Sequence, residues 1–256
     1  MITTYSAFNY GHTVTDENKY INFIDNVVEL TAELSIGAYT LGDYATEIAR
    51  AMNDASTTQE YETTLDRVTG KITIDSVGVF SLLVTSGTNA SQSAFSMMGF
   101  NGADLFGLNS YEGDSRSGSI YYPQRLLQSY VDFEDFKKTL NSKVNQSASG
   151  QVEVVSYGRV KFMQCNIDLI TDITPQLAIK NNPTGVSDYR NFIDYCTQKA
   201  PIEFVKDINQ PIVFVECLLE STPESKDGVD YTIKELYARK LAGYYESGLL
   251  TFRKLD

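Results

Sequence analysis

The chain has 256 residues, of which 42% are hydrophobic and 21% are charged, as in a folded protein with one large domain or two small ones. With 33 acidic against 21 basic residues, its formal charge is −12, which excludes a generally basic nucleic-acid-binding surface. There is neither a run of about 18 apolar residues nor a signal-peptide pattern, so we expect a protein made in the bacterial cytoplasm, without a membrane partner.

The first elements are a strand followed by a helix. Residues 27–34 alternate between apolar and polar positions, which is typical of a half-buried strand. The period then lengthens to that of a helix over residues 41–53, and Thr40 is suitably placed to cap it. Its predicted apolar face consists of Leu41, Tyr44, Ala45, Ile48 and Met52.

A hairpin and a polar loop follow. Residues 61–65 and 72–74 alternate on either side of a turn at residues 68–70, and residues 80–84 predict the next strand. The loop at residues 86–93 contains only small and polar side chains and lies between apolar segments. We expect Gly99 to turn the backbone after it, and Asp104 to fix the turn by accepting hydrogen bonds from nearby N–H groups.

Residues 108–119 are rich in Gly and Ser, and we place the boundary between two domains there, at 1–110 and 111–256. Beyond it, residues 151–170 predict two strands around Gly158, and a helix is expected near residues 187–199. The predicted fold class is therefore α+β and mainly β. It consists of two β-rich halves, sheets or barrel-like sandwiches, each with one packed amphipathic helix.

The sequence offers few groups for catalysis. His12 is the single histidine, and its polar surroundings near the N-terminus predict a surface position. Cys165, Cys196 and Cys217 are widely spaced in apolar surroundings, which predicts buried free thiols. No phosphate-binding loop or nucleophile motif is present. We therefore predict no catalytic residue, no cofactor and no metal site, and a protein that is not an enzyme.

Aromatic residues and strand edges favour assembly instead. The pairs at residues 121–122 and 244–245 place one tyrosine ring on each face of a strand, so Tyr122 and Tyr245 are candidate contacts with a neighbouring chain. The last strand, which contains Phe252, and the first twenty residues are candidate arms that could extend a neighbour's sheet.

Three segments carry a resemblance to known proteins. The series YATEIARAMN, TGKITI and FSLLVTSGTNASQSAFSMMGFNGADLFG resembles a recurrent segment of virion structural proteins of tailed bacteriophages. In the second half, SASGQVEVVSYG, APIEFVKD and LAGYYESGLLTFRKLD are also similar to phage structural proteins. The chain most resembles small tail or baseplate components of contractile-tailed phages.

This resemblance implies a non-enzymatic virion protein that joins tail tube, sheath and baseplate subunits through protein–protein contacts, in a symmetric homo-oligomer. The loop at residues 86–93 would then meet a neighbour, with Ser86, Thr88, Asn89 and Ser91 as candidate contacts. Head decoration or neck attachment is an alternative within the virion. A host- or carbohydrate-binding module is a second hypothesis, and a cell-wall hydrolase with two facing carboxylates is a third.

Overall fold

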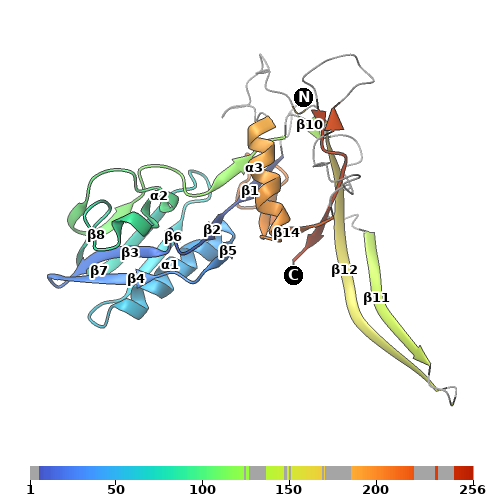
Figure 1. Cartoon of the computed structure of the whole chain (residues 1–256), viewed down its shortest axis with the longest axis horizontal. Coiled ribbons are helices and arrows are strands. Elements are labelled where there is room, and N and C mark those ends of the chain that lie inside the picture. Colours follow the sequence, from blue (N-terminus) through green and yellow to red (C-terminus); the bar gives the residue numbers. More distant parts are fainter. Residues whose placement is uncertain are drawn as a thin grey trace. The chain divides into compact units, whose positions relative to one another are not determined.

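The computed structural model describes residues 6–123, 125–126, 137–146, 149, 151–168, 170, 186–221, 234–235 and 245–255. Antiparallel strands dominate these residues, together with three α-helices, which confirms the predicted α+β, mainly β class (Figure 1). The chain divides into two compact units. Unit 1 comprises Met1–Tyr121 and Ala200–Phe214, and unit 2 comprises Tyr122–Lys199 and Val215–Asp256.

Unit 1 is built on a five-stranded sheet of order β4-β3-β7-β6, in which β8 also pairs with β7. Its elements are β1 (Ala7–Tyr10), β2 (His12–Val14), β3 (Tyr20–Asp25), β4 (Val28–Glu33), β5 (Gly37–Tyr39), α1 (Leu41–Ala55), β6 (Tyr61–Leu65), β7 (Ile72–Leu82), the 3-10 turn η1 (Ala90–Gln92), α2 (Phe95–Met98), β8 (Leu105–Glu112), β9 (Ser119–Tyr121) and β13 (Ile202–Val205).

Helix α1 forms where the sequence predicts it and covers the sheet with its predicted apolar face. All five residues of that face are buried, and the helix packs against β4, β5 and β6. Thr40 caps the helix by accepting a hydrogen bond from the Asp43 N–H at 3.1 Å. In the core beneath it, Tyr61 packs edge to face against both Phe23 and Phe80, and Phe80 packs in the same way against Tyr111.

Strand β7 differs from the prediction of two separate strands. It runs without a break from Ile72 to Leu82 and pairs with β6, β3 and β8 along its length. Its register with β8 shifts between Asp75 and Phe80, and again before Leu82. Such irregularities bend a strand, although in β7 the same alternate positions, from Ile72 to Leu82, stay on the buried face.

The first strand is enclosed within unit 1, which corrects the prediction that the N-terminal residues form a free arm. β1 pairs with β13 along one edge and with β9 along the other, so its backbone groups are used within the chain. Phe8 lies opposite both Phe204 and Tyr121 and stacks on Phe204 at a ring distance of 5.0 Å. Residues 200–214 therefore belong to the same unit as the N-terminus.

Unit 2 contains a sheet in which β17 pairs with β12 and β14, while β12 also pairs with β10 and β11. Its elements are β10 (Arg125–Leu126), β11 (Lys137–Gln146), β12 (Val152–Asp168), α3 (Val186–Thr197), β14 (Phe214–Ser221), which begins at the last residue of unit 1, β15 (Lys234–Glu235), β16 (Tyr245–Glu246) and β17 (Leu249–Lys254). The two strands predicted around Gly158 are one continuous strand, β12. Its register with β11 shifts opposite Gly158, between Leu140 and Ser142.

Helix α3 supplies one side of the unit 2 core. Its predicted apolar face is buried, with Tyr189 and Phe192 fully enclosed. The three cysteines are free and buried, as predicted, and Cys196 belongs to this helix. Burial raises the pKa of the Cys165 thiol to about 12, so the thiol remains protonated and unreactive at neutral pH.

Candidate interaction surface

Asp104 holds the start of the polar loop, and not the turn after Gly99 that it was expected to fix. The Asp104 Oδ1 atom accepts hydrogen bonds from the Thr85 N–H at 2.7 Å and from the Ser86 N–H at 3.3 Å, and Oδ2 accepts one from the Ser86 hydroxyl. Gly99 has φ +89°, a left-handed conformation that glycine adopts without strain. Gly99 thus turns the backbone as expected, whereas Asp104 bonds to N–H groups far earlier in the chain than expected.

The loop also lies on the polar face of strands β3 and β4. Thr88 donates its N–H to Glu29 Oε1 at 2.7 Å, and Asn89 donates its N–H to Asn22 Oδ1 at 3.1 Å. Gly87 approaches the sheet so closely that a Cβ atom there would lie 2.3 Å from Asn22 Cβ. These bonds fix the loop, so it presents its outward side chains in one arrangement.

The four predicted loop contacts differ in exposure. Ser86, Thr88 and Ser91 are exposed. Asn89 is partly buried, and its side-chain amide donates to Thr31 Oγ1 at 3.3 Å. Asn89 therefore mainly anchors the loop, while the other three side chains are accessible to a neighbouring molecule.

Next to this loop, unit 1 exposes several large apolar residues. We call them, together with Ser86, Thr88, Glu29 and Asp104, the end surface. The side chains of Val27 and Val77 are 96% and 91% exposed. The apolar members are Val27, Val28, Val77, Val79, Phe106 and Leu108.

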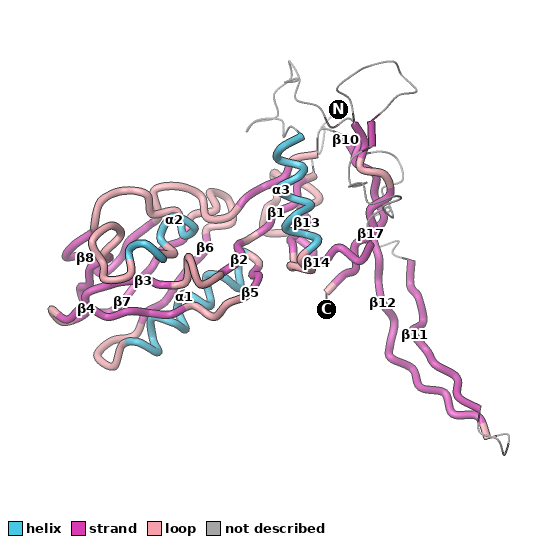
Figure 2. The backbone as a smooth tube through the Cα atoms, in the orientation of Figure 1, coloured by secondary structure: helices cyan, strands magenta, loops and turns pink. Residues whose placement is uncertain are grey.

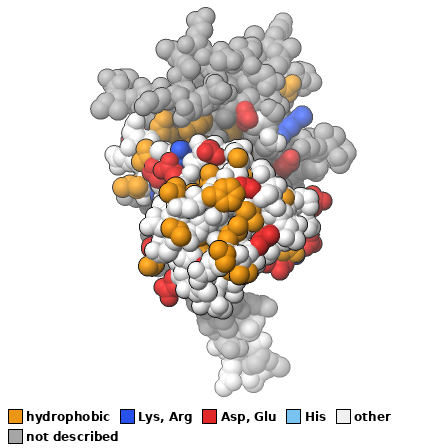
Figure 3. All heavy atoms as spheres, turned by 90° about the vertical axis from the view of Figure 1, so that its left-hand side faces the viewer, with side chains coloured by type: hydrophobic (Ala, Val, Ile, Leu, Met, Phe, Trp, Pro, Cys, Tyr) orange, Lys and Arg blue, Asp and Glu red, His pale blue; other side chains and the backbone are white. Residues whose placement is uncertain are grey.

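Strand register shows that these residues lie at one end of the sheet. Leu108 pairs with Phe80, Phe80 with Asp25, and Asp25 with Val28, which places one row across β8, β7, β3 and β4. Val77 and Val79 line an open pocket together with Asn26, which adjoins Val27. Figure 3 shows hydrophobic side chains gathered over the face at this end of unit 1, with acidic side chains around them.

The charges of the end surface are negative. Residues 26–31, 76–80, 85–93 and 104–110 include Glu29 and Asp104 but no lysine or arginine. The hydrogen bond from the Thr88 N–H lowers the pKa of Glu29. Partial burial raises the pKa of Asp104, but hydrogen bonds from Ser86 and Thr85 outweigh it and leave the pKa lowered. Both carboxylates are therefore ionised at neutral pH.

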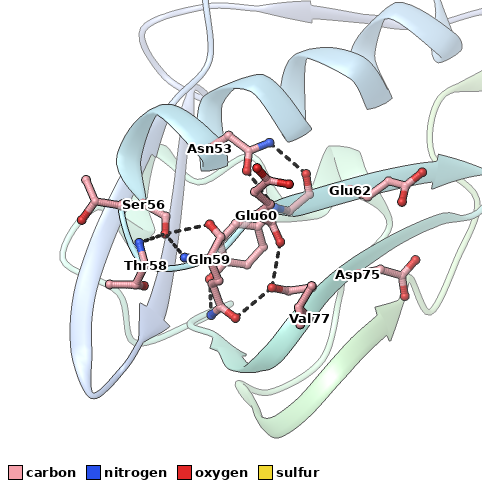
Figure 4. Close-up of a pocket in the computed structure, with 11 residues that line it drawn as sticks. Asn53, Ser56, Thr58, Gln59, Glu60, Glu62, Asp75 and Val77 are labelled. Atoms are coloured by element: carbon pink, nitrogen blue, oxygen red, sulfur yellow. Dashed lines mark hydrogen bonds between the residues drawn. The ribbon is translucent and has the colours of Figure 1, made fainter.

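A second feature of unit 1 is an open polar pocket of about 1030 Å³ beside the C-terminus of α1 (Figure 4). Within it, Gln59 connects the α1–β6 segment to buried Asp25, to which its Nε2 donates at 2.8 Å. Gln59 Oε1 accepts hydrogen bonds from the Ser76 hydroxyl at 2.8 Å and the Gly78 N–H at 3.1 Å. Since these groups bond to one another, they hold the segment in place, and we assign them a structural role.

Two carboxylates at the edge of this pocket face each other across the sheet. Glu62 and Asp75 are directly paired between β6 and β7, and Figure 4 shows them away from the hydrogen-bonded cluster. A like-charged pair in this position slightly destabilises the sheet. Among the described residues, no group of three or more His, Cys, Asp or Glu side chains is arranged to hold a metal ion.

The remaining candidate contacts lie in different places. Tyr122 and Tyr245 are partly exposed, in the segment after β9 and in β16. Phe252 is fully buried, because β17 is an inner strand paired with both β12 and β14. The prediction that Phe252 and the last strand meet a neighbour is therefore corrected, since both strand edges and the ring are used within the chain.

His12 also corrects a prediction, because it lies partly buried in β2. Its Nε2 is 3.0 Å from the Ser117 hydroxyl, and its ring packs on Tyr44 at a centroid distance of 4.7 Å. Burial lowers the pKa of His12 to about 4, although a hydrogen bond to the Met97 backbone opposes the shift. The imidazole is consequently neutral at physiological pH and contributes to packing.

Sequence reasoning did not find the apolar part of the end surface. One usable signal was Gly78 between Val77 and Val79, because a glycine inside a strand often marks a bulge.

No protein-family model matches the sequence, and no curated protein is significantly similar to it. No helix among the described residues has the length and apolar character needed to cross a membrane.

Proposed function

We propose that this chain is a non-enzymatic structural protein of a phage virion, which joins tail and baseplate subunits through protein–protein contacts. The observation that carries the proposal is the end surface, an exposed group of six apolar side chains with carboxylates beside it. Contiguous apolar residues with polar surroundings are typical of a protein contact, since exposing them to water is unfavourable.

The fixed loop beside the end surface supports the same function. Asp104, Glu29 and Asn22 already hold its backbone, so docking against Ser86 and Thr88 orders little additional chain. A preordered surface loses less conformational entropy on association, and this favours repeated and specific assembly. The placement in the tail or baseplate comes from the resemblance of the sequence, and head decoration or neck attachment would use the same chemistry.

The alternative of a carbohydrate-binding module requires exposed aromatic rings in a groove. In the polar pocket of unit 1, the aromatic residue is Tyr61, which is 3% exposed and stacks inside the core. The structure therefore favours the protein contact over sugar binding at this pocket.

Immunogold electron microscopy of phage particles from the source lysate, with an antibody against this chain, tests the proposed function. We expect label at the tail end. Label on the head or neck would retain the virion role and change its location. Particles without label, although the epitope is accessible, would contradict the structural role.

A further inference from the structure

Unit 2 extends into a long two-stranded ribbon, formed by β11 and the first part of β12. The two strands pair from Lys137 with Phe162 to Gln146 with Val152. Among the described pairings, β17 contacts β12 only at residues 162–166, so residues 152–160 pair with β11 alone. Figure 2 shows this part of the ribbon running beyond the rest of the unit 2 sheet.

An isolated two-stranded ribbon is marginally stable in water, because it lacks a sheet or helix to pack against. A strand edge that has no neighbour in its own sheet offers N–H and C=O groups that pair readily with another chain. The ribbon therefore has the properties of an element that gains stability from a partner.

The charge of the ribbon is opposite to that of the protein. Residues 137–162 contain five basic residues against Glu153 as the single acidic one, a formal balance of +4 in a chain of −12. The basic residues are Lys137, Lys138, Lys143, Arg159 and Lys161. Apolar residues, among them Val144 and Val154, lie between the basic residues in the sequence, and the backbones of these two valines are directly paired.

We infer that the ribbon of one copy docks on the end surface of unit 1 of a second copy, so that copies associate head to tail. This inference rests on the proposed function, since it names the partner of the same end surface. The two elements match in composition: each combines apolar residues with charged ones, namely Glu29 and Asp104 on the end surface and five basic residues in the ribbon sequence.

The dimensions also allow this contact. Exposed Leu108 and Val28 stand at the two ends of a row that crosses four strands, about 14 Å apart at a spacing of about 4.8 Å per strand, and Phe80 and Asp25 between them are buried. The ribbon segment at residues 152–160 is about 30 Å long at about 3.3 Å per residue, so it is long enough to reach both exposed residues.

Repulsion between like charges disfavours a symmetric contact between two end surfaces. Such a contact would bring Glu29 and Asp104 of both copies together with no lysine or arginine from the same surface to neutralise them. Juxtaposed like charges oppose association. A head-to-tail contact instead pairs different surfaces, and repeating it generates a ring or an open chain of copies.

Two double variants of the full chain test the inference by sedimentation velocity over a wide concentration range. Phe106→Ser with Leu108→Ser removes apolar contacts from the end surface, and Lys138→Glu with Lys143→Glu reverses charge on the ribbon. For the wild type we expect oligomers that grow beyond a dimer as concentration rises. Each double variant should raise the apparent dissociation constant at least about tenfold.

Mixing the two variants gives the decisive result. The end-surface variant keeps an intact ribbon and the ribbon variant keeps an intact end surface, so the mixture should form a one-to-one dimer and stop there. A symmetric contact would give no such rescue. Matched controls outside both surfaces are Val68→Ser with Ile212→Ser and Arg190→Glu with Lys206→Glu, which should associate like the wild type.

A wild type that stays monomeric at every concentration, a ribbon variant that associates normally, or a mixture that stays monomeric would each overturn the inference. Circular dichroism melting curves verify that the variants are folded. The outcome is separable from that of the proposed function: labelled particles with a monomeric chain would contradict the head-to-tail contact alone. Unlabelled particles with a head-to-tail oligomer would contradict the virion role alone.

Discussion

The partly buried His12 makes the stability of unit 1 depend on pH in a way that can be calculated. Burial lowers its pKa to about 4, whereas the same histidine in the unfolded chain titrates near 6.5. Between these values the unfolded state binds a proton that the folded state does not. The free energy of unfolding therefore falls as the pH drops from 6.5 towards 4, and the effect is complete below 4.

The size of the effect follows from the difference of about 2.5 pKa units. At about 1.4 kcal/mol per unit, protonation of His12 costs about 3 kcal/mol when the transition is complete. Between pH 7 and pH 5 the linkage relation gives a loss of about 2 kcal/mol. This is a large fraction of the stability of a typical domain.

Urea unfolding of the wild type and of His12→Gln, at several pH values between 7 and 4.5, measures this loss. Glutamine retains a polar side chain next to Ser117 without titrating, so the carboxylates contribute alike in both proteins and cancel in the difference. The wild type should lose about 2 kcal/mol more than the variant between pH 7 and pH 5.

A second measurement is direct, because His12 is the single histidine of the chain. Its imidazole gives one NMR signal, which should titrate near pH 4 in the folded protein and near 6.5 in urea. Unfolding curves that stay parallel at every pH, together with a folded-state titration near 6.5, would refute the assignment of His12 as a buried neutral group.

Three further predictions concern buried groups. Arg67→Ala removes the guanidinium 2.7 Å from Glu203, a carboxylate that is 1% exposed, and should cost about 3–5 kcal/mol in chemical denaturation, with Glu203→Gln restoring part of the loss. Gly87→Ala should destabilise unit 1 by about 1–3 kcal/mol, because its Cβ would overlap Asn22; equal melting temperatures would contradict this close approach. Cys165 and the other two thiols should react with a maleimide at pH 8 only after denaturation, and fast labelling of the native chain would show that the unit 2 core is open.

Local patterns in the sequence were sufficient to predict helix α1 and the β6–β7 hairpin. Each depends on residues close together in the chain: a cap and an apolar face for the helix, and a turn for the hairpin. In these cases the local preference and the final fold agree.

Long-range pairing could not be predicted in the same way. Phe8 packs on Phe204, nearly two hundred residues away, and Phe252 lies on a strand that is enclosed from both sides. Alternation of apolar residues shows that a segment is a strand, but it does not show which strands lie beside it. The two terminal segments therefore resembled free arms, although their hydrogen bonds are made within the chain.

The same limitation explains why the end surface was missed. The alternation of β7 places Val77 and Val79 on the face opposite to Ile74 and Phe80, and the strand by itself does not show whether another element covers that face. An ordinary edge would carry lysine or proline at such a place to prevent association. Here the exposed valines have neither beside them in residues 76–80, and the basic residues are concentrated instead on the ribbon of unit 2. The end surface is therefore negative and the ribbon is positive. Each is complementary in charge to the other element on a second copy, and not to a second copy of itself.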